Sequence, residues 1–91
     1  MPVEVRLPTV LRSRAGGKSS IQADGGTLGE VLSDAVRQFP DLAGQVITDG
    51  GALHKFVNVY RNDEDVRYLD KLDTTVSGGD VISILPAVAG G

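Results

Sequence analysis

Apolar and polar residues alternate at the start of the chain. Every second position from Val3 is apolar at first, which predicts a half-buried strand within residues 3–11. Pro8 weakens the far end of this strand, because proline has no N–H to donate to a ladder. A glycine-containing turn at 15–18 leads to a second apolar–polar segment at 19–23, so the two segments predict an N-terminal hairpin.

After the hairpin, the apolar residues no longer recur at every second position but at the spacing of an α-helix. Thr27 and Glu30 have the arrangement of a capping box, in which each side chain bonds the backbone N–H of the other residue. Pro40 ends the helix, since the residue before a proline is disfavoured in helical geometry. The apolar positions form one stripe: Leu28, Val31, Leu32, Ala35, Val36 and Phe39. A helix with a single apolar face is expected to cover a sheet.

The second half of the chain predicts three more strands. We expect a strand at 56–61, a short strand near 66–68 after a turn at 62–65, and a last strand at 80–85. Segment 41–53 has no clear period, and 70–79 has the composition of a loop. This order of elements favours an α+β fold, a mixed β-grasp (ubiquitin-like) sheet with one main helix packed on one face and an extended C-terminal tail. The central position of the last strand beside the first rests on fold analogy.

The residues after the last strand predict a tail that carries the reactive group. We expect a β-grasp domain over 1–86 and a flexible tail over 87–91 that ends in Gly90 and Gly91. Glycine has no Cβ, so such an end can lie extended in a narrow tunnel, and Pro86 keeps it from becoming helical. The carboxylate of Gly91 is the candidate reactive group, because no other part of the chain has a pattern of catalytic residues.

Composition narrows the class of protein. The chain has 91 residues and a net charge of −3, which predicts one domain without the clustered lysine and arginine of nucleic-acid binders. It has no cysteine and one histidine, His54, so we expect no disulfide framework and no metal site. No segment approaches the ~20 apolar residues of a membrane span, and no signal-peptide pattern precedes the first strand. We therefore expect a cytoplasmic protein that is a monomer when free.

Four features together resemble the ThiS/MoaD family of ubiquitin-like sulfur carriers, and the resemblance covers the whole chain. They are the β-grasp order, the turn at 62–66 that contains Asn62, the pair Gly79-Asp80 before the last strand, and the Gly90-Gly91 end. Segments 8–12, 56–58, 62–67 and 85–91 most resemble the actinobacterial members of the family that serve cysteine biosynthesis.

The resemblance implies a carrier that acts with partner enzymes and is not an enzyme itself. An E1-like adenylyltransferase/sulfurtransferase would use ATP to adenylate the Gly91 carboxylate, and a sulfur donor would convert the adenylate to a thiocarboxylate. The thiocarboxylate would attack an aminoacrylate held on pyridoxal phosphate in a cysteine synthase. A zinc-dependent metallopeptidase would then release cysteine. The carrier itself would bind no cofactor.

Partners are expected to dock next to the tail. Strand alternation turns Phe56, Asn58 and Tyr60 away from the helix, on the same open face as Leu85. An exposed apolar patch of this kind often marks a protein interface, although segment 41–53 could instead cover part of it. The expected partner-binding residues are Phe56, Asn58, Tyr60, Leu85, Pro86, Val88 and Ala89.

The residues leave three alternatives open. The same carrier chemistry could serve thiamine, molybdopterin or thiolated natural-product synthesis. The chain could be a ubiquitin-like modifier whose Gly91 carboxyl becomes joined to lysines of target proteins. It could also be a β-grasp interaction domain whose two final glycines have no chemical role.

Overall fold

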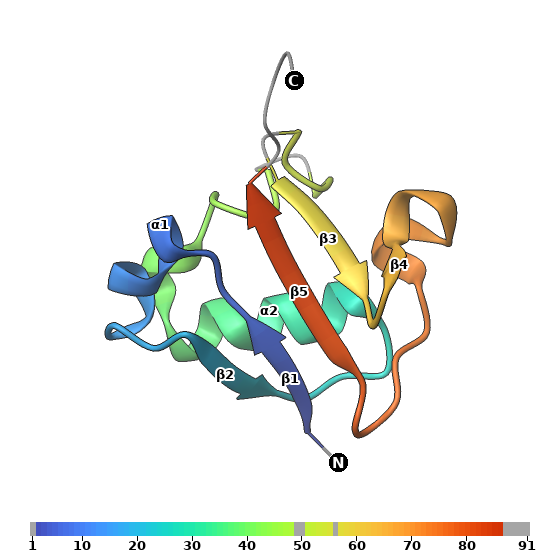
Figure 1. Ribbon diagram of the computed structural model, residues 1–91, viewed down its shortest axis with the longest axis horizontal. Coiled ribbons are helices and arrows are strands. Elements are labelled where there is room, and N and C mark those ends of the chain that lie inside the picture. The colour runs from blue at the N-terminus through green and yellow to red at the C-terminus, as the bar shows by residue number, and fades with distance from the viewer. Residues whose placement is uncertain (1, 49–50, 56, 87–91) are drawn as a thin grey trace.

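A computed structural model describes residues 2–48, 51–55 and 57–86. Within these residues the chain forms one five-stranded mixed sheet, in the order β2-β1-β5-β3-β4, with α2 across one face (Figure 1). The elements are β1 Val3–Arg6, α1 Thr9–Arg12, β2 Ser20–Ala23, α2 Leu28–Gln38, β3 Val57–Arg61, β4 Glu64–Asp65 and β5 Val81–Pro86. Short 3₁₀ turns lie at Ser13–Ala15, Pro40–Leu42, Val66–Tyr68 and Lys71–Asp73.

The last strand lies in the centre of the sheet. β5 is parallel to β1, with Val5 opposite Ile82, and antiparallel to β3, with Val59 opposite Ile84. A strand bonded on both sides and buried on one face is the best-anchored position in a sheet. The predicted α+β class and β-grasp arrangement are confirmed, including the placement of the last strand beside the first.

α2 forms where the capping box and the apolar stripe predict it. The Thr27 hydroxyl accepts the Glu30 N–H at 3.3 Å, and the Glu30 carboxylate accepts the Thr27 N–H at 3.2 Å. The helix ends at Gln38, two residues before Pro40. Its stripe packs on the sheet: Leu28 and Val31 have no exposed surface, and burial of each contributes roughly 1.5–3 kcal/mol.

The N-terminal hairpin differs from the prediction in its first strand. β1 ends at Arg6, and the residues expected to continue it form α1. Pro8 is the N-cap of this helix, a position that needs no backbone donor. The apolar spacing of Leu7 and Leu11 matches a helical turn as well as a strand, and both side chains are buried. The prediction of strand up to residue 11 is therefore wrong beyond Arg6.

The short strand after β3 is also displaced from its predicted position. β4 comprises Glu64–Asp65, inside the segment expected to be a turn, and Val66–Tyr68 is 3₁₀. Asp65 explains the change, since its carboxylate accepts the Arg67 N–H at 2.9 Å and so stabilises a turn immediately after it. Val66 is fully buried in the observed turn, and a buried apolar residue is compatible with a strand as well, so its apolar character does not distinguish the two conformations.

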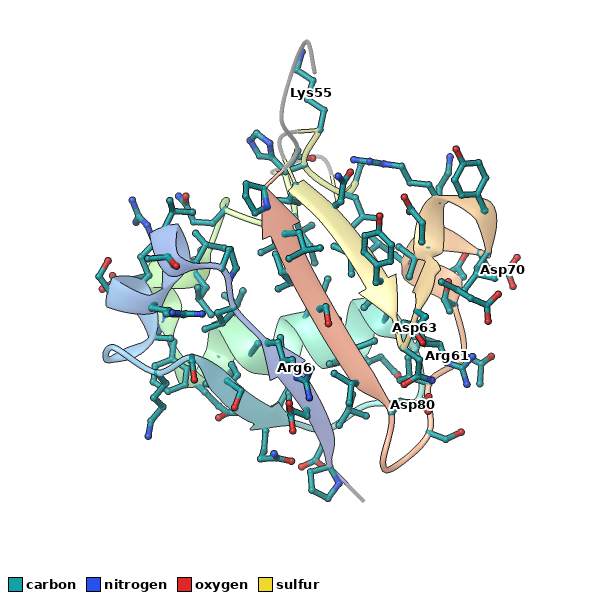
Figure 2. The ribbon with its side chains drawn as sticks, viewed as in Figure 1. Arg6, Lys55, Arg61, Asp63, Asp70 and Asp80 are labelled. Carbon is teal, nitrogen blue, oxygen red and sulfur yellow. The ribbon has the colours of Figure 1, made fainter. Side chains whose placement is uncertain are left out.

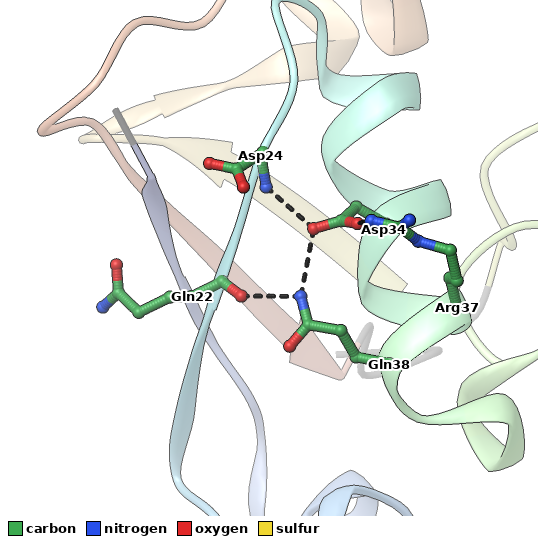
Figure 3. A network of polar contacts seen from close by, with 5 residues as sticks. All are labelled: Gln22, Asp24, Asp34, Arg37 and Gln38. Atoms are coloured by element: carbon green, nitrogen blue, oxygen red, sulfur yellow. Dashed lines mark hydrogen bonds and ion pairs between the residues drawn. The ribbon is translucent and has the colours of Figure 1, made fainter.

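A polar network joins α2 to the outer edge of β2 (Figure 3). The Asp34 carboxylate accepts the Asp24 N–H at 2.9 Å and the Gln38 side-chain amide at 3.0 Å, and it also pairs with Arg37. Gln38 donates in addition to the Gln22 carbonyl at 2.8 Å. Because Leu7 and Ser19 form a bonded pair, the Gln22 carbonyl and the Asp24 N–H point outward from the edge. The helix thus satisfies two edge groups that would otherwise face solvent.

Candidate functional site

The root of the predicted tail is the C-terminal end of β5. Pro86, the last described residue, lies opposite Val57, and Leu85 lies opposite Asn58. The described part of the chain therefore ends on the central strand of the sheet. The predicted reactive and tail residues Gly91, Gly90, Ala89 and Val88 lie outside the described residues, as does Phe56.

The open face of the sheet carries the described members of the predicted docking patch. Alternation buries Ile82 and Ile84 against α2 and turns Leu85 outward, where 47% of it is exposed. Asn58 and Tyr60 share this face and are half-buried, with Tyr60 opposite Ser83. The structure thus brings Leu85, Asn58 and Tyr60 to one face, next to the end of β5.

Segment 41–53 packs its main apolar residues into the core. Leu42 is 3% exposed and Val46 is 4% exposed, and both belong to the cluster between the sheet and α2. The His54 N–H donates to the Val46 carbonyl at 2.7 Å, which brings the chain back toward β3. Leu85 stays the exposed apolar residue at the end of β5.

Arg67 lies at this site although the sequence pattern does not single it out. It projects from the 3₁₀ turn Val66–Tyr68, donates to the Val57 carbonyl at 2.7 Å and bonds the Asn58 side-chain oxygen. Asn58 is therefore held in place by a guanidinium. In the predicted strand at 66–68, the direction of the Arg67 side chain would follow from strand alternation. Its contact with Asn58 depends instead on the turn after Asp65, which the sequence pattern does not predict.

The opposite end of β5 is fixed by a separate polar cluster. The Asp80 carboxylate accepts Arg61 Nε at 2.9 Å, Asn62 Nδ2 at 3.3 Å and the Ser77 N–H at 2.9 Å. The hydrogen bond from the Ser77 N–H, followed by Arg61 and Asn62, lowers the pKa of Asp80 against the opposing effect of burial. Figure 2 shows Arg61 and Asp80 together where β5 begins, far from Lys55. The cluster fixes the start of the strand that leads to the tail.

A comparison with protein-family models shows to which family the chain belongs. A model described as the ThiS family matches residues 5–91. This chain is a member of the ThiS family.

Relatives of this ThiS-family protein match it over their whole length. Sulfur carrier protein CysO of Mycobacterium tuberculosis is 46% identical, with all of both chains covered. Small archaeal modifier protein 3 of Haloferax volcanii is 37% identical, again over all of both chains. A chain in the crystal structure of the Amycolatopsis orientalis BexX/CysO complex is 43% identical, has a TM-score of 0.89, and covers 98% of this chain and 99% of that one.

The match to the ThiS family and the identity to sulfur carrier protein CysO support a sulfur-carrier role for this chain. The resemblance to the ThiS/MoaD-family sulfur carriers is thereby confirmed, and it extends to the sulfur carrier proteins named CysO. Among the described residues, no group of three His, Asp or Glu side chains could hold a metal ion. In the same part of the chain, no helix has the length and apolar character that crossing a bilayer requires.

Proposed function

We propose that this ThiS-family chain carries sulfur as a thiocarboxylate on Gly91. The observation that carries the proposal is the position of Pro86 at the end of the central strand, held opposite Val57 and five residues before Gly91. Five extended residues reach about 17 Å at most. A segment of that length can enter an enzyme's active site while the folded domain stays outside.

A partner enzyme has to activate the carboxylate. An α-carboxylate has a pKa of about 3.5, so it is ionised at neutral pH but is a weak nucleophile. In the proposed cycle one carboxylate oxygen attacks the α-phosphorus of ATP, and pyrophosphate leaves. A sulfur nucleophile from a donor then attacks the acyl carbon, and AMP leaves with the shared oxygen. The resulting thiocarboxylate is a softer and stronger nucleophile than the carboxylate was.

Cysteine biosynthesis is the pathway that the relatives favour. The 46% identity to CysO of Mycobacterium tuberculosis over both whole chains supports it. In this pathway the thiocarboxylate sulfur would attack an aminoacrylate on the pyridoxal phosphate of a cysteine synthase. In the resulting thioester, the cysteine amino group would displace the sulfur at the Gly91 carbonyl and form a peptide bond. A metallopeptidase would then hydrolyse that bond, which releases cysteine and restores the Gly91 carboxylate. The solved complex of BexX with CysO supports the view that such a carrier docks on partner proteins.

The proposal is tested by reconstitution with the E1-like enzyme of the same organism. With ATP and sulfide, the intact mass of the chain should rise by the difference between sulfur and oxygen, and the thermal melt should not change. Deletion of Gly91 should abolish ATP–pyrophosphate exchange without lowering the melting temperature. Tyr68→Ser, at a residue that is 88% exposed and is not among the predicted partner-binding residues, is the matched control and should react normally. A Gly91-deleted chain that still accepts sulfur would disprove the proposal.

A protein modifier is the second candidate function. The 37% identity to small archaeal modifier protein 3 favours it. In that case the Gly91 carboxyl would end in an isopeptide bond with a lysine of a target protein. Blots of tagged protein from its host would show a ladder of conjugates that disappears when Gly91 is deleted. A single unconjugated band, together with the intact mass of the thiocarboxylate form, would support the sulfur-carrier function and exclude the modifier function.

A further inference from the structure

The last residues of β5 are supported from one side. The ladder between β1 and β5 ends where Arg6 lies opposite Ser83, whereas the ladder between β3 and β5 continues until Val57 lies opposite Pro86. The final three residues of β5 therefore pair with β3 alone. Whatever holds the beginning of β3 in place also holds the point from which the five residues to Gly91 start.

The last hydrogen-bonded pair of this ladder follows from its register. Asn62 donates its N–H to the Val81 carbonyl, so every second pair from there along the two antiparallel strands is hydrogen-bonded. Asn58 and Leu85 form such a pair, the last one within the described residues. Pro86 then falls at a position without a ladder bond to β3, where its missing N–H has no cost.

Arg67 lies at the outer edge of β3 at the same point. Within the described part of the chain, β4 pairs with β3 at Tyr60 and Arg61 and does not reach Val57. Because Val57 belongs to a non-bonded pair, its carbonyl points away from β5, and Arg67 Nη2 donates to it at 2.7 Å. Arg67 Nη1 bonds the Asn58 side-chain oxygen. The guanidinium thus covers the edge of β3 that β4 is too short to cover.

The turn that carries Arg67 is itself fixed. Val66 has no exposed surface, and the Asp65 carboxylate accepts the Arg67 N–H at 2.9 Å. This turn stands beside β3 (Figure 1). A guanidinium presents its N–H groups as a planar fork, so a fixed backbone places both of its contacts at once. Arg67 therefore braces the beginning of β3 although its side chain is at the surface.

We propose that Arg67 is a positioning residue for the reactions of Gly91. It holds Val57 and Asn58 in strand geometry, and this keeps Leu85 on the sheet. The tail then starts from a fixed point and in a fixed direction. In this role Arg67 acts through β3 and not on the reacting atoms. The inference rests on the proposed function, because it concerns how the domain presents the Gly91 carboxylate to an enzyme.

The brace limits the length of the free segment. If β5 frays back to Ser83, that segment grows from five residues to eight, and its greatest reach grows from about 17 Å to about 27 Å. The effective concentration at the end of a tether longer than its span falls roughly as the −3/2 power of the length, which is about twofold here. Loss of a fixed direction lowers the rate further, since the reacting groups must meet in one orientation.

Hydrogen exchange tests the brace without any partner enzyme. In Arg67→Gln the Leu85 amide should exchange about two- to tenfold faster than in the wild type, as loss of one net hydrogen bond predicts. The Ser83 amide lies in the same strand where β1 and β3 both pair with it, so it is the internal control and should accelerate less. Equal acceleration of the two amides would overturn the proposal, because Arg67 would then affect global stability alone.

The reaction tests the consequence of the brace. ATP–pyrophosphate exchange is measured against carrier concentration with the E1-like enzyme. Arg67→Gln should lower the rate at saturation about two- to tenfold and leave the half-saturating concentration unchanged. Arg67→Lys keeps the charge but not the fork, so it should recover only part of the rate. Tyr68→Ser changes the same turn outside the fork and is the matched control, with wild-type exchange and rate.

The possible outcomes distinguish the positioning role from the proposed function. A wild-type chain that the enzyme does not adenylate would overturn the proposed function, while the exchange of the Leu85 amide would still decide whether the brace exists. Faster Leu85 exchange in Arg67→Gln with an unchanged rate at saturation would overturn the positioning role alone. Unchanged Leu85 exchange with a raised half-saturating concentration would also overturn it, and would make Arg67 a direct contact of the enzyme.

Discussion

Asn62 and Val81 bond each other in both directions at the corner between β3 and β5. The Asn62 N–H donates to the Val81 carbonyl at 2.7 Å, and the Asn62 side-chain oxygen accepts the Val81 N–H at 3.1 Å. Asn62 has a φ of 55°, a left-handed conformation that asparagine tolerates better than most residues. Asn62 therefore both forms the turn after β3 and holds Val81, the first residue of β5, in position.

Asn62 variants should show these two contributions separately. Asn62→Ala loses the side-chain bonds and adds backbone strain, so the free energy of unfolding should fall by about 2 kcal/mol. Asn62→Gly loses the same bonds but adopts the left-handed conformation without strain, so it should lose less. Urea denaturation measures both. Equal losses in the two variants would mean that strain contributes nothing here.

Stability should fall in acid because of two aspartates. The hydrogen bond from the Asp24 N–H, followed by Arg37, lowers the pKa of Asp34, and the Ser77 N–H is the first cause for Asp80. Each folded pKa lies below 3.8, the ordinary pKa of an aspartate, so the stabilisation is present above that pH and is lost as pH falls through the folded pKa. Urea unfolding between pH 6 and about pH 2.5 should show the decline.

The aspartate variants provide the control for this pH effect. Asp34→Asn and Asp80→Asn should each be less stable than the wild type near neutral pH, because an amide cannot accept as the carboxylate does. Both variants should lose less additional stability on acidification than the wild type loses. If the decline in acid had the same size in all three proteins, other carboxylates would have to cause it.

Gly25 should not tolerate a side chain. A Cβ at this position would lie 2.7 Å from the Val31 backbone nitrogen and 2.8 Å from the Glu30 Cβ, distances that only movement of the helix start could relieve. Gly25→Ala should therefore lower stability by about 1–3 kcal/mol. The adjacent Gly26→Ala is the control, since the nearest atom to its added Cβ is a Glu30 carboxylate oxygen at 3.4 Å, an ordinary van der Waals distance. Thermal melts that rank the two variants in the opposite order would contradict the prediction.

Arg67 should contribute to stability although it is exposed. Arg67→Ala leaves the Val57 carbonyl and the Asn58 side chain without their shared donor, so the free energy of unfolding should fall by about 1 kcal/mol. Arg14→Ala removes a single long bond of 3.4 Å to the Asp41 carbonyl and should change it little. Parallel urea titrations compare the two variants.

The sequence predicts most of the fold because its signals are local. The capping box of Thr27 and Glu30 and the helical stripe that follows determine α2 with little reference to the rest of the chain. Pro8 marks correctly where the β1 ladder weakens, but the turn of helix that begins at Thr9 depends on burying Leu11, which is a tertiary effect. The position of β4 depends in the same way on the bond between the Asp65 carboxylate and the Arg67 N–H.

The candidate site is predictable only in part for the same reason. Strand alternation correctly turns Leu85 outward and buries Ile82 and Ile84. The contact of Arg67 with Asn58 joins residues across a turn whose conformation the apolar pattern does not specify. The early end of β1 at Arg6 is likewise not revealed by any periodicity in residues 3–11.

The bonds from α2 to β2 have a consequence for protein at high concentration. Asp34 and Gln38 already occupy the outward Asp24 N–H and Gln22 carbonyl, so a second copy that approached β2 edge to edge would find these positions taken. Extension of the sheet from one molecule to the next is thereby opposed at β2. A cell can accumulate many copies of such a protein with less risk of fibrous aggregation along that strand.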